Sequence, residues 1–172
     1  MRHDAWRRDA AAYPLHGELL PRFADADIWQ HLNNTSLITL HGEALQQALA
    51  SVFGPHAWRD SQPVLACVSN ATDFLLEAHY PAPLTWAARL TGVSADGLRV
   101  ATALFQHGKC VGQHDTTLVG WADGAMAGFS DDQIVALRAA AVPGADALRL
   151  AAPAVSAGTA TAADPAGMQD PA

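Results

Sequence analysis

Residues 23–34 read Phe23-Ala24-Asp25-Ala26-Asp27-Ile28-Trp29-Gln30-His31-Leu32-Asn33-Asn34. This short segment carries carboxylates, an imidazole and carboxamides, and it joins a predicted strand at Glu18–Phe23 to a predicted helix at Thr35–Phe53. Catalytic side chains often lie at such junctions, because the rigid elements fix them while the connection leaves them accessible. A cluster of so many polar side chains between apolar segments has either a structural or a catalytic role. The rest of the chain helps to decide between these two.

The segment after this junction has the periodicity of one long amphipathic helix. Apolar or buried-type residues recur there at steps of three and four. They are Leu37, Ile38, His41, Ala44, Leu45, Ala48, Leu49, Val52 and Phe53. Thr39, Glu43, Gln47 and Ser51 form a polar stripe opposite. Asn33 and Asn34 are suitable N-cap residues, and Gly54 followed by Pro55 ends the helix.

The chain then changes to the pattern of long strands, rich in Val, Thr, Leu and aromatic residues. The predicted strands are Pro63–Tyr80, Leu84–Val93, Leu98–His107 and Cys110–Trp121. The last two gaps have hairpin length and turn composition, so we expect a four-strand antiparallel meander. One helix cannot cover both faces of such a sheet. We therefore expect a curved sheet around the helix, with a second copy of the chain covering the outer face.

The pattern divides the chain into one domain and two flanking segments. We expect residues 1–15 to be a flexible N-terminal arm, residues 16–139 to be the domain, and residues 140–172 to be a disordered tail rich in Ala, Pro and Gly. A short helix is predicted after Ser130, which is a good cap. Within the tail, only Ala145–Leu150 has a weak helical pattern.

Composition narrows the class of protein. The chain has 172 residues, half of them hydrophobic, which suits one soluble domain with a proper core. A net charge of −7 argues against a nucleic-acid partner. No apolar segment is long enough to span a bilayer, and the charged N-terminus does not resemble a secretory signal, so we expect a cytoplasmic protein without a membrane partner. Cys67 and Cys110 are expected to be buried residues in strands rather than a disulfide.

The order of these features resembles a known family, the hot-dog fold acyl-CoA thioesterases of the 4-hydroxybenzoyl-CoA thioesterase type. The resemblance covers roughly residues 16–138. It is sharpest in Arg22-Phe23-x-Asp25-x-Asp27-x-x-Gln30-His31-Leu32-Asn33-Asn34, and Glu43-Ala44 extends it. It implies an α+β fold in which a curved antiparallel sheet wraps a long central helix. Gln30, where much of the family has Gly, is more similar to the plant acyl-carrier-protein thioesterases, but those carry an Asn where this chain has Trp29.

The resemblance also implies roles for individual residues. The second Asp of the family motif is its catalytic carboxylate, either a general base or a nucleophile, and it corresponds to Asp27. A backbone N–H at the start of the central helix, here at about Asn34, polarises the thioester carbonyl. His31 matches a histidine that is catalytic in some branches and structural in others. Glu43 lies near the position of a catalytic Glu found in other branches.

Thioester chemistry suits these residue types. A thiol with a pKa of about 8.5 leaves as thiolate with little help, so the reaction needs an activated oxygen nucleophile and a stabilised oxyanion rather than a strong acid. An Asp next to a helix N-terminus supplies both. Asp25 is expected to be structural, and Asp27 in isolation is also compatible with a simple turn residue. We place Trp29 and Asn33 on the substrate-binding side, with Trp29 shaping the acyl pocket.

Other chemistries have little support in the sequence. It contains no Gly-x-Ser-x-Gly elbow, no Gly-x-Gly-x-x-Gly and no P-loop. His107 and His114 have no third ligand at metal-binding spacing, so we expect neither a metal nor another cofactor. The expected partners are an acyl-CoA or acyl-carrier-protein substrate and further copies of the chain, as a homodimer or homotetramer. The alternatives are a non-catalytic hot-dog protein that binds these thioesters and, less well supported, a hot-dog dehydratase that uses Asp27 and His31.

Overall fold

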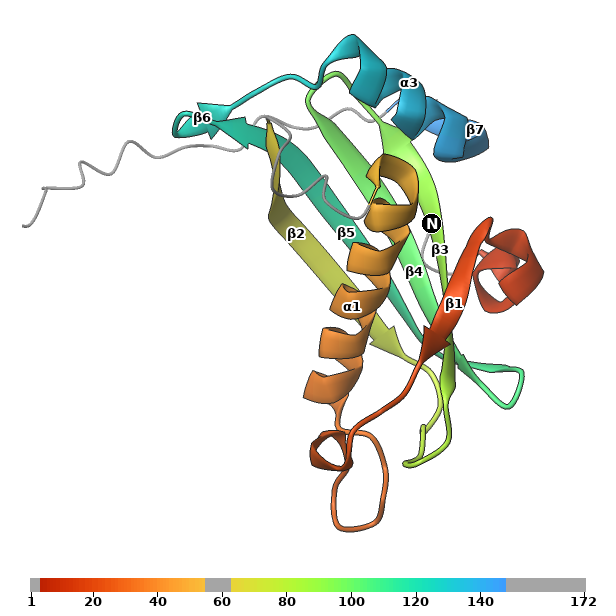
Figure 1. Ribbon diagram of the computed structural model, residues 1–172. Coiled ribbons are helices and arrows are strands. Elements are labelled where there is room, and N and C mark those ends of the chain that lie inside the picture. Colours follow the sequence, from red (N-terminus) through yellow and green to blue (C-terminus); the bar gives the residue numbers. More distant parts are fainter. Residues whose placement is uncertain (1–3, 55–62, 148–172) are drawn as a thin grey trace, which may run out of the picture.

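One long helix lies across one face of a curved sheet in the computed structural model, which describes residues 4–54 and 63–147 (Figure 1). The architecture is α+β, as the sequence pattern predicts. The principal elements are β1 (Leu15–Leu19), α1 (Asn34–Phe53), β2 (Val64–Phe74), β3 (Leu84–Val93), β4 (Gly97–Gln106), β5 (Lys109–Ala122) and α3 (Asp131–Ala140). The shorter ones are the 3-10 helices η1 (Ala5–Arg8), η2 (Ala10–Ala12) and η3 (Phe23–Asp25), and the strands β6 (Ala125–Met126) and β7 (Ala141–Ala147).

The main strands lie in the order β1-β3-β4-β5-β2, and each pairs with its neighbour in antiparallel orientation. The two predicted hairpins, β3–β4 and β4–β5, are confirmed. The expectation that the first long strand would continue the same meander is wrong, because β2 pairs with β5 rather than with β3. Residues 75–83 between β2 and β3 are long enough to cross to the other side of the sheet, whereas the hairpin turns hold their strands together.

Two predicted strand boundaries are also wrong. The strand expected at Glu18–Phe23 is found at Leu15–Leu19, and the 3-10 helix η3 takes up Phe23–Asp25. The strand expected over Pro63–Tyr80 ends at Phe74. Beyond Phe74 the backbone N–H groups of Leu75 and Leu76 both donate to the carbonyl of Val111, and the chain next forms the isolated bridge between His31 and His79. The consequence is that irregular, accessible backbone surrounds the start of α1.

Helix α1 buries the face that the sequence predicts, with small differences. Its buried residues are Leu37, Leu40, His41, Ala44, Leu45, Ala48 and Leu49. Ile38 is exposed instead, while the predicted polar stripe from Thr39 to Ser51 faces solvent. The buried face packs on inward-facing side chains of the sheet, such as Leu98, Val100 and Leu104 of β4. No helix in the described part of the chain is both long and apolar enough to cross a bilayer.

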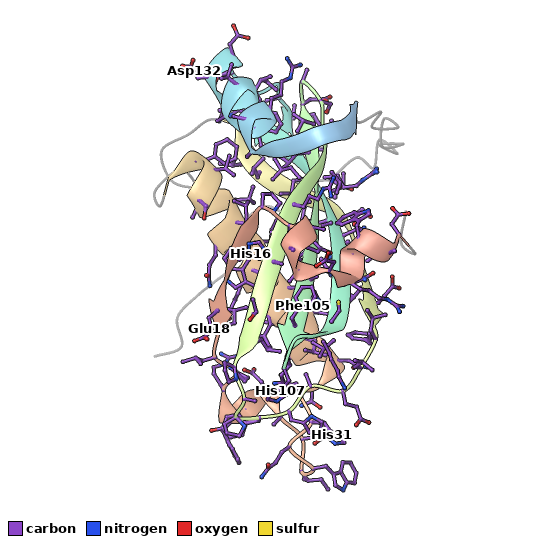
Figure 2. All side chains as sticks on the ribbon, turned by 90° about the vertical axis from the view of Figure 1, so that its right-hand side faces the viewer. His16, Glu18, His31, Phe105, His107 and Asp132 are labelled. Carbon is purple, nitrogen blue, oxygen red and sulfur yellow. The ribbon has the colours of Figure 1, made fainter. Side chains whose placement is uncertain are left out.

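The N-terminal segment is not a loose arm from residue 4 onward, in contrast to the sequence-based expectation. It forms η1 and η2 and packs on the outer face of the sheet (Figure 2). Buried Tyr13 contacts Phe105 and Cys110 of the same apolar cluster. The guanidinium of Arg7, also buried, pairs with Asp115 of β5 at 2.9 Å. These long-range contacts, which local composition does not reveal, order the segment.

The two cysteines differ in environment. Cys110 is buried in the outer-face cluster, as expected. Cys67 lies on the edge strand β2 and is exposed, so the prediction that both are buried is wrong for this residue.

The C-terminal helix is confirmed and the tail prediction is partly wrong. Ser130 accepts a hydrogen bond from the backbone N–H of Gln133, whose side chain in turn binds the backbone of Ser130, so α3 begins with a capping box. Residues 141–147, predicted to be disordered, form β7, which pairs in parallel with β3. The weak helical run Ala145–Leu150 therefore falls partly in this strand, and its last residues and the rest of the tail lie outside the described residues.

A buried polar cluster lies between α1 and the sheet. The Nδ1 atom of His41 lies 2.9 Å from the hydroxyl of Thr102, and its ring stacks on that of His114, with 5.2 Å between centroids. Its Nε2 atom has no hydrogen-bond partner among the described residues. It faces Gly112, where an added Cβ would lie 3.0 Å from it. Burial lowers the pKa of His41 to about 3, with nearby His114 contributing to the shift, so the imidazole is neutral at neutral pH.

This cluster predicts a specific loss of stability in acid. Below pH 6.5 the unfolded chain binds a proton at His41 that the folded chain does not, so the free energy of unfolding falls as pH is lowered. The slope from this one group approaches about 1.4 kcal/mol per pH unit. Urea unfolding at several pH values between 6.5 and 4 measures this pH dependence of the free energy of unfolding. His41→Leu should flatten the curve relative to the wild-type chain, and parallel curves would contradict the assignment.

Candidate functional site

Asp27 organises the loop that follows η3. One of its carboxylate oxygens, Oδ1, accepts hydrogen bonds from the backbone N–H groups of Trp29 and His31, both at 2.9 Å. The backbone N–H of Asp27 in turn donates to the carbonyl of His31. The other oxygen, Oδ2, takes no part in this turn. Asp27 is therefore held in place by its own loop while its carboxylate stays partly accessible.

Asp25 has a different environment and is buried. Its carboxylate accepts from the backbone N–H of Arg22 at 2.7 Å and from the Arg22 guanidinium at 2.8 Å. The hydrogen bond from Arg22 is the main cause that holds the pKa of this carboxyl below its ordinary value. Its backbone carbonyl accepts from the N–H of Asn33, immediately before α1. These contacts agree with the structural role that we expected for Asp25.

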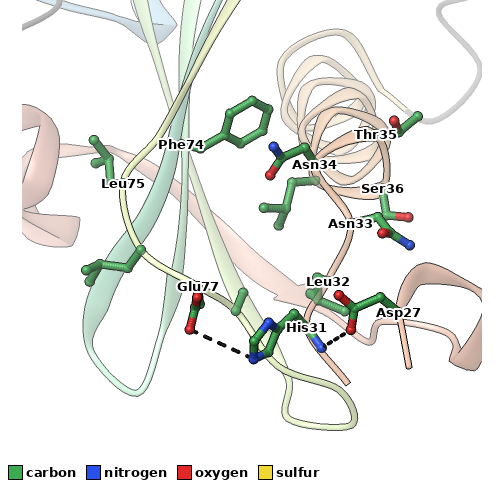
Figure 3. Close-up of a pocket in the computed structure, with 13 residues that line it drawn as sticks. Asp27, His31, Leu32, Asn33, Asn34, Thr35, Ser36, Phe74, Leu75 and Glu77 are labelled. Carbon is green, nitrogen blue, oxygen red and sulfur yellow. Dashed lines mark hydrogen bonds and ion pairs between the residues drawn. The ribbon is translucent and has the colours of Figure 1, made fainter. Parts of the chain in front are cut away.

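A cavity of about 790 Å³ lies between this loop and the end of β2 (Figure 3). It is lined by Asp27, residues 31–37 and residues 74–78. The loop and the start of α1 contribute most of the polar groups, whereas Phe74, Leu75 and Leu76 contribute an apolar wall. Figure 3 shows His31 between Asp27 and Glu77. The volume is in the range of small-molecule sites.

The first turn of α1 forms part of this cavity wall. Asn33 is the N-cap residue, but its side chain makes no capping hydrogen bond, so the predicted capping by this side chain is wrong. Asn34, Thr35 and Ser36 follow as the first helical residues, and all line the cavity. Backbone N–H groups in a first helical turn have no partner within the helix, and they carry the positive end of the helix dipole. This end of the cavity is therefore suited to an oxygen that carries negative charge.

Of the six site residues expected from the sequence, four lie together on the cavity: Asp27, His31, Asn33 and Asn34. The other two lie elsewhere. Trp29, with 70% of its surface exposed, is at the tip of the loop and does not line the cavity. Glu43 is exposed on the polar side of α1, away from the cavity lining.

Sequence reasoning missed residues after β2 that face the same site. Glu77 lines the cavity opposite Asp27, and its Oε2 lies 3.8 Å from Nε2 of His31. His79 is near, with its ring 4.7 Å from that of His31. A signal was present in Glu77-Ala78-His79, because residues two apart in extended backbone point to the same side. What the sequence could not show is that this segment lies beside residue 31.

Comparison of the structure with solved structures finds the same architecture in named thioesterases. A thioesterase superfamily protein from Jannaschia sp. CCS1 has a TM-score of 0.70 and 16% identity, covering 74% of this chain and 93% of that one. A thioesterase from Thermus thermophilus, solved with coenzyme A and Zn, has a TM-score of 0.64 and 18% identity, covering 76% and 98%. The chain has the hot-dog fold. A 1,4-dihydroxy-2-naphthoyl-CoA thioesterase from Synechocystis agrees, with a TM-score of 0.62 and 18% identity over 72% and 94%.

The comparisons by sequence give no such match. No family model matches the chain, and no curated protein matches it. At identities of 18% or less, the solved structures establish the hot-dog fold but carry no residue roles with them. The resemblance expected from the sequence is thus confirmed as a likeness of fold, and the chemistry has to be argued from the site.

The contacts of Asp25 predict that Asp25→Asn destabilises the chain without altering the fold. The new amide N–H₂ would face the Arg22 donors, so we expect a loss of about 1–3 kcal/mol at neutral pH. Because the folded pKa of Asp25 is lowered, its contribution is present above its ordinary pKa and disappears as the pH falls through the folded value. Urea unfolding at neutral and strongly acidic pH should therefore show the two chains converging in acid.

Gln106 of β4 predicts a second stability effect. Its buried side-chain amide accepts from the backbone N–H of His79 at 2.8 Å and donates to the carbonyls of His79 and Ala82. Gln106→Leu replaces the amide by an apolar side chain and removes all three bonds to part-buried backbone groups, so we expect a loss of about 1–3 kcal/mol in total. We expect a lower midpoint in urea unfolding monitored by tryptophan fluorescence. An unchanged midpoint would mean that this segment contributes nothing to global stability.

Proposed function

We propose that this hot-dog protein is an acyl-CoA thioesterase, which hydrolyses an acyl thioester to a free acid and a thiol. The observation that carries the proposal is that the Asp27 carboxylate and the first turn of α1 line one cavity. These are the two groups that thioester hydrolysis requires, a base for an oxygen nucleophile and donors for an oxyanion. The apolar wall from Phe74 to Leu76 supports an acyl group as the ligand.

In the proposed reaction the substrate carbonyl oxygen binds at the backbone N–H groups that begin with Asn34. As general base, Asp27 takes a proton from a water molecule, whose oxygen attacks the carbonyl carbon. The tetrahedral oxyanion then collapses, the C–S bond breaks and the thiol leaves as thiolate. As nucleophile, Asp27 would instead form the C–O bond itself, and water would hydrolyse the resulting anhydride. The geometry is compatible with both routes, since Oδ2 is outside the turn that Oδ1 maintains.

Several finer assignments belong to this proposal. We infer that His31 contacts the substrate or transfers a proton, because its ring borders the cavity between Asp27 and Glu77 (Figure 3). Asn33 lines the cavity and keeps its substrate-binding role. Neither Trp29 nor Glu43 lines the cavity of a single chain, so a role for either would require a second copy of the chain. One similar structure was solved with coenzyme A and another is named a 1,4-dihydroxy-2-naphthoyl-CoA thioesterase, which makes acyl-CoA the preferred substrate class over acyl carrier protein.

We further propose that the chain acts as a homodimer or homotetramer. β2 is an edge strand of the main sheet, and it exposes the apolar side chains of Val64, Val68 and Phe74. A long edge strand with exposed apolar residues favours pairing with another chain. Phe74 also lines the cavity, so a copy docked there would cover part of the site.

Substitution of Asp27 tests the proposed chemistry. Asp27→Asn keeps an oxygen that can accept from the N–H groups of Trp29 and His31, so the loop is retained while the base is lost. We expect kcat to fall about 10²–10⁴-fold. Thiol release from short, long and aromatic acyl-CoA substrates measures it. Asp132→Asn, the same change at an exposed site at the other end of the molecule, should have wild-type activity (Figure 2).

Other outcomes select other functions. Unchanged hydrolysis by a folded Asp27→Asn chain would defeat the mechanism. Binding of acyl-CoA in calorimetry without turnover of any substrate would identify a non-catalytic acyl-CoA-binding protein. Interconversion of enoyl-CoA and 3-hydroxyacyl-CoA would identify a dehydratase.

A further inference from the structure

Three side chains of metal-ligating type converge beside the cavity: His31, Glu77 and His79. Their ligand atoms all lie within 4.8 Å of one another. Nε2 of His31 is 3.8 Å from Oε2 of Glu77, and the two imidazole rings stand edge-to-face at 4.7 Å between centroids. Figure 3 shows Glu77 and His31 pointing toward each other across the cavity from different segments.

The backbones that carry these side chains are joined directly. His31 and His79 face each other in an isolated antiparallel bridge. On either side of it, the N–H of Leu32 donates to the carbonyl of Ala78 at 2.7 Å, and the N–H of Tyr80 donates to that of Gln30 at 2.9 Å. The Cα positions of both histidines are therefore set by backbone pairing and do not depend on a bound ligand.

Each histidine is also anchored from a second direction. Asp27 binds both the N–H and the carbonyl of His31. The buried Gln106 binds both the N–H and the carbonyl of His79. Between Glu77 and His79, Ala78 is buried, so its two neighbours turn toward the opposite, accessible side. Binding of an ion would need the ordering of side chains alone, which keeps the entropic cost low.

The geometry points to a binding site for one divalent transition-metal ion, best suited to Zn²⁺, formed by His31, Glu77 and His79. Two imidazole nitrogens and one carboxylate oxygen are a ligand set found in zinc sites that keep an open coordination position. Mg²⁺ and Ca²⁺ fit less well, because they prefer oxygen ligands throughout.

The spacing of the side chains is close to what zinc requires. Tetrahedral bonds of about 2.1 Å place ligand atoms about 3.4 Å apart. The 3.8 Å between His31 and Glu77 needs only a small rotation to reach this value. Such rotations are available, since Glu77 is 72% exposed in its side chain and His79 is also exposed. An ion here would border the same cavity as Asp27.

Metal titration of the full-length chain, without a histidine tag and after removal of metals with EDTA, tests this site. The affinity for Zn²⁺ is measured by competition with a coloured chelator, and the visible bands of bound Co²⁺ show whether the coordination is tetrahedral. We expect one ion per chain. His79→Gln should weaken binding by at least about tenfold, the lower bound for loss of a second-shell partner.

Two further variants make the result specific. His107→Gln, which removes an exposed histidine of the β4–β5 turn, should bind like the wild-type chain (Figure 2). Glu77→Gln, at an exposed side chain, should weaken binding even if His79→Gln fails to fold. Equal affinity in wild-type, His79→Gln and Glu77→Gln chains, or no binding by the wild-type chain, would overturn the proposal. Because the readout is metal binding, its failure is distinguishable from a failure of thioester hydrolysis.

Discussion

The backbone pairing between residues 30–32 and residues 78–80 is the constraint on which the site depends. It fastens the loop after η3 to the segment after β2, and these two segments form the opposite walls of the cavity. The bonds from Leu32 to Ala78 and from Tyr80 to Gln30 thus set the width of the cavity. The side chain of Gln106 in β4 binds the backbone of His79, so these paired segments are also attached to the sheet, and the sheet fixes the position of the site.

What could be predicted from the sequence is what local pattern determines. The buried face of α1, the two hairpins and the capped helix α3 depend on residues close together in the chain, and all three are confirmed. The pairing of β2 with β5 and the packing of Arg7 against Asp115 depend on contacts between distant segments. Composition carries almost no information about such contacts, which is why the sequence alone predicts a flexible arm at residues 1–15.

The same distinction explains the site. Asp27, His31, Asn33 and Asn34 lie within one short segment, so one loop and one helix start are sufficient to bring them together. Glu43 also belongs to α1, but it lies on the exposed side of the helix, whereas Leu37, His41 and Ala44 lie on the buried side. Glu77 and His79 come from elsewhere in the chain and reach the site only through tertiary pairing.

The contact between His41 and Gly112 has a consequence for how this sequence can diverge. The imidazole occupies the space that a side chain at position 112 would need, since an added Cβ would lie 3.0 Å from Nε2. A larger residue at 112 therefore requires the buried His41 ring to shift by a few tenths of an ångström or more, and a smaller residue at 41 removes that requirement. Among homologues these two positions should covary, so that an aromatic or imidazole ring at one is accompanied by glycine at the other.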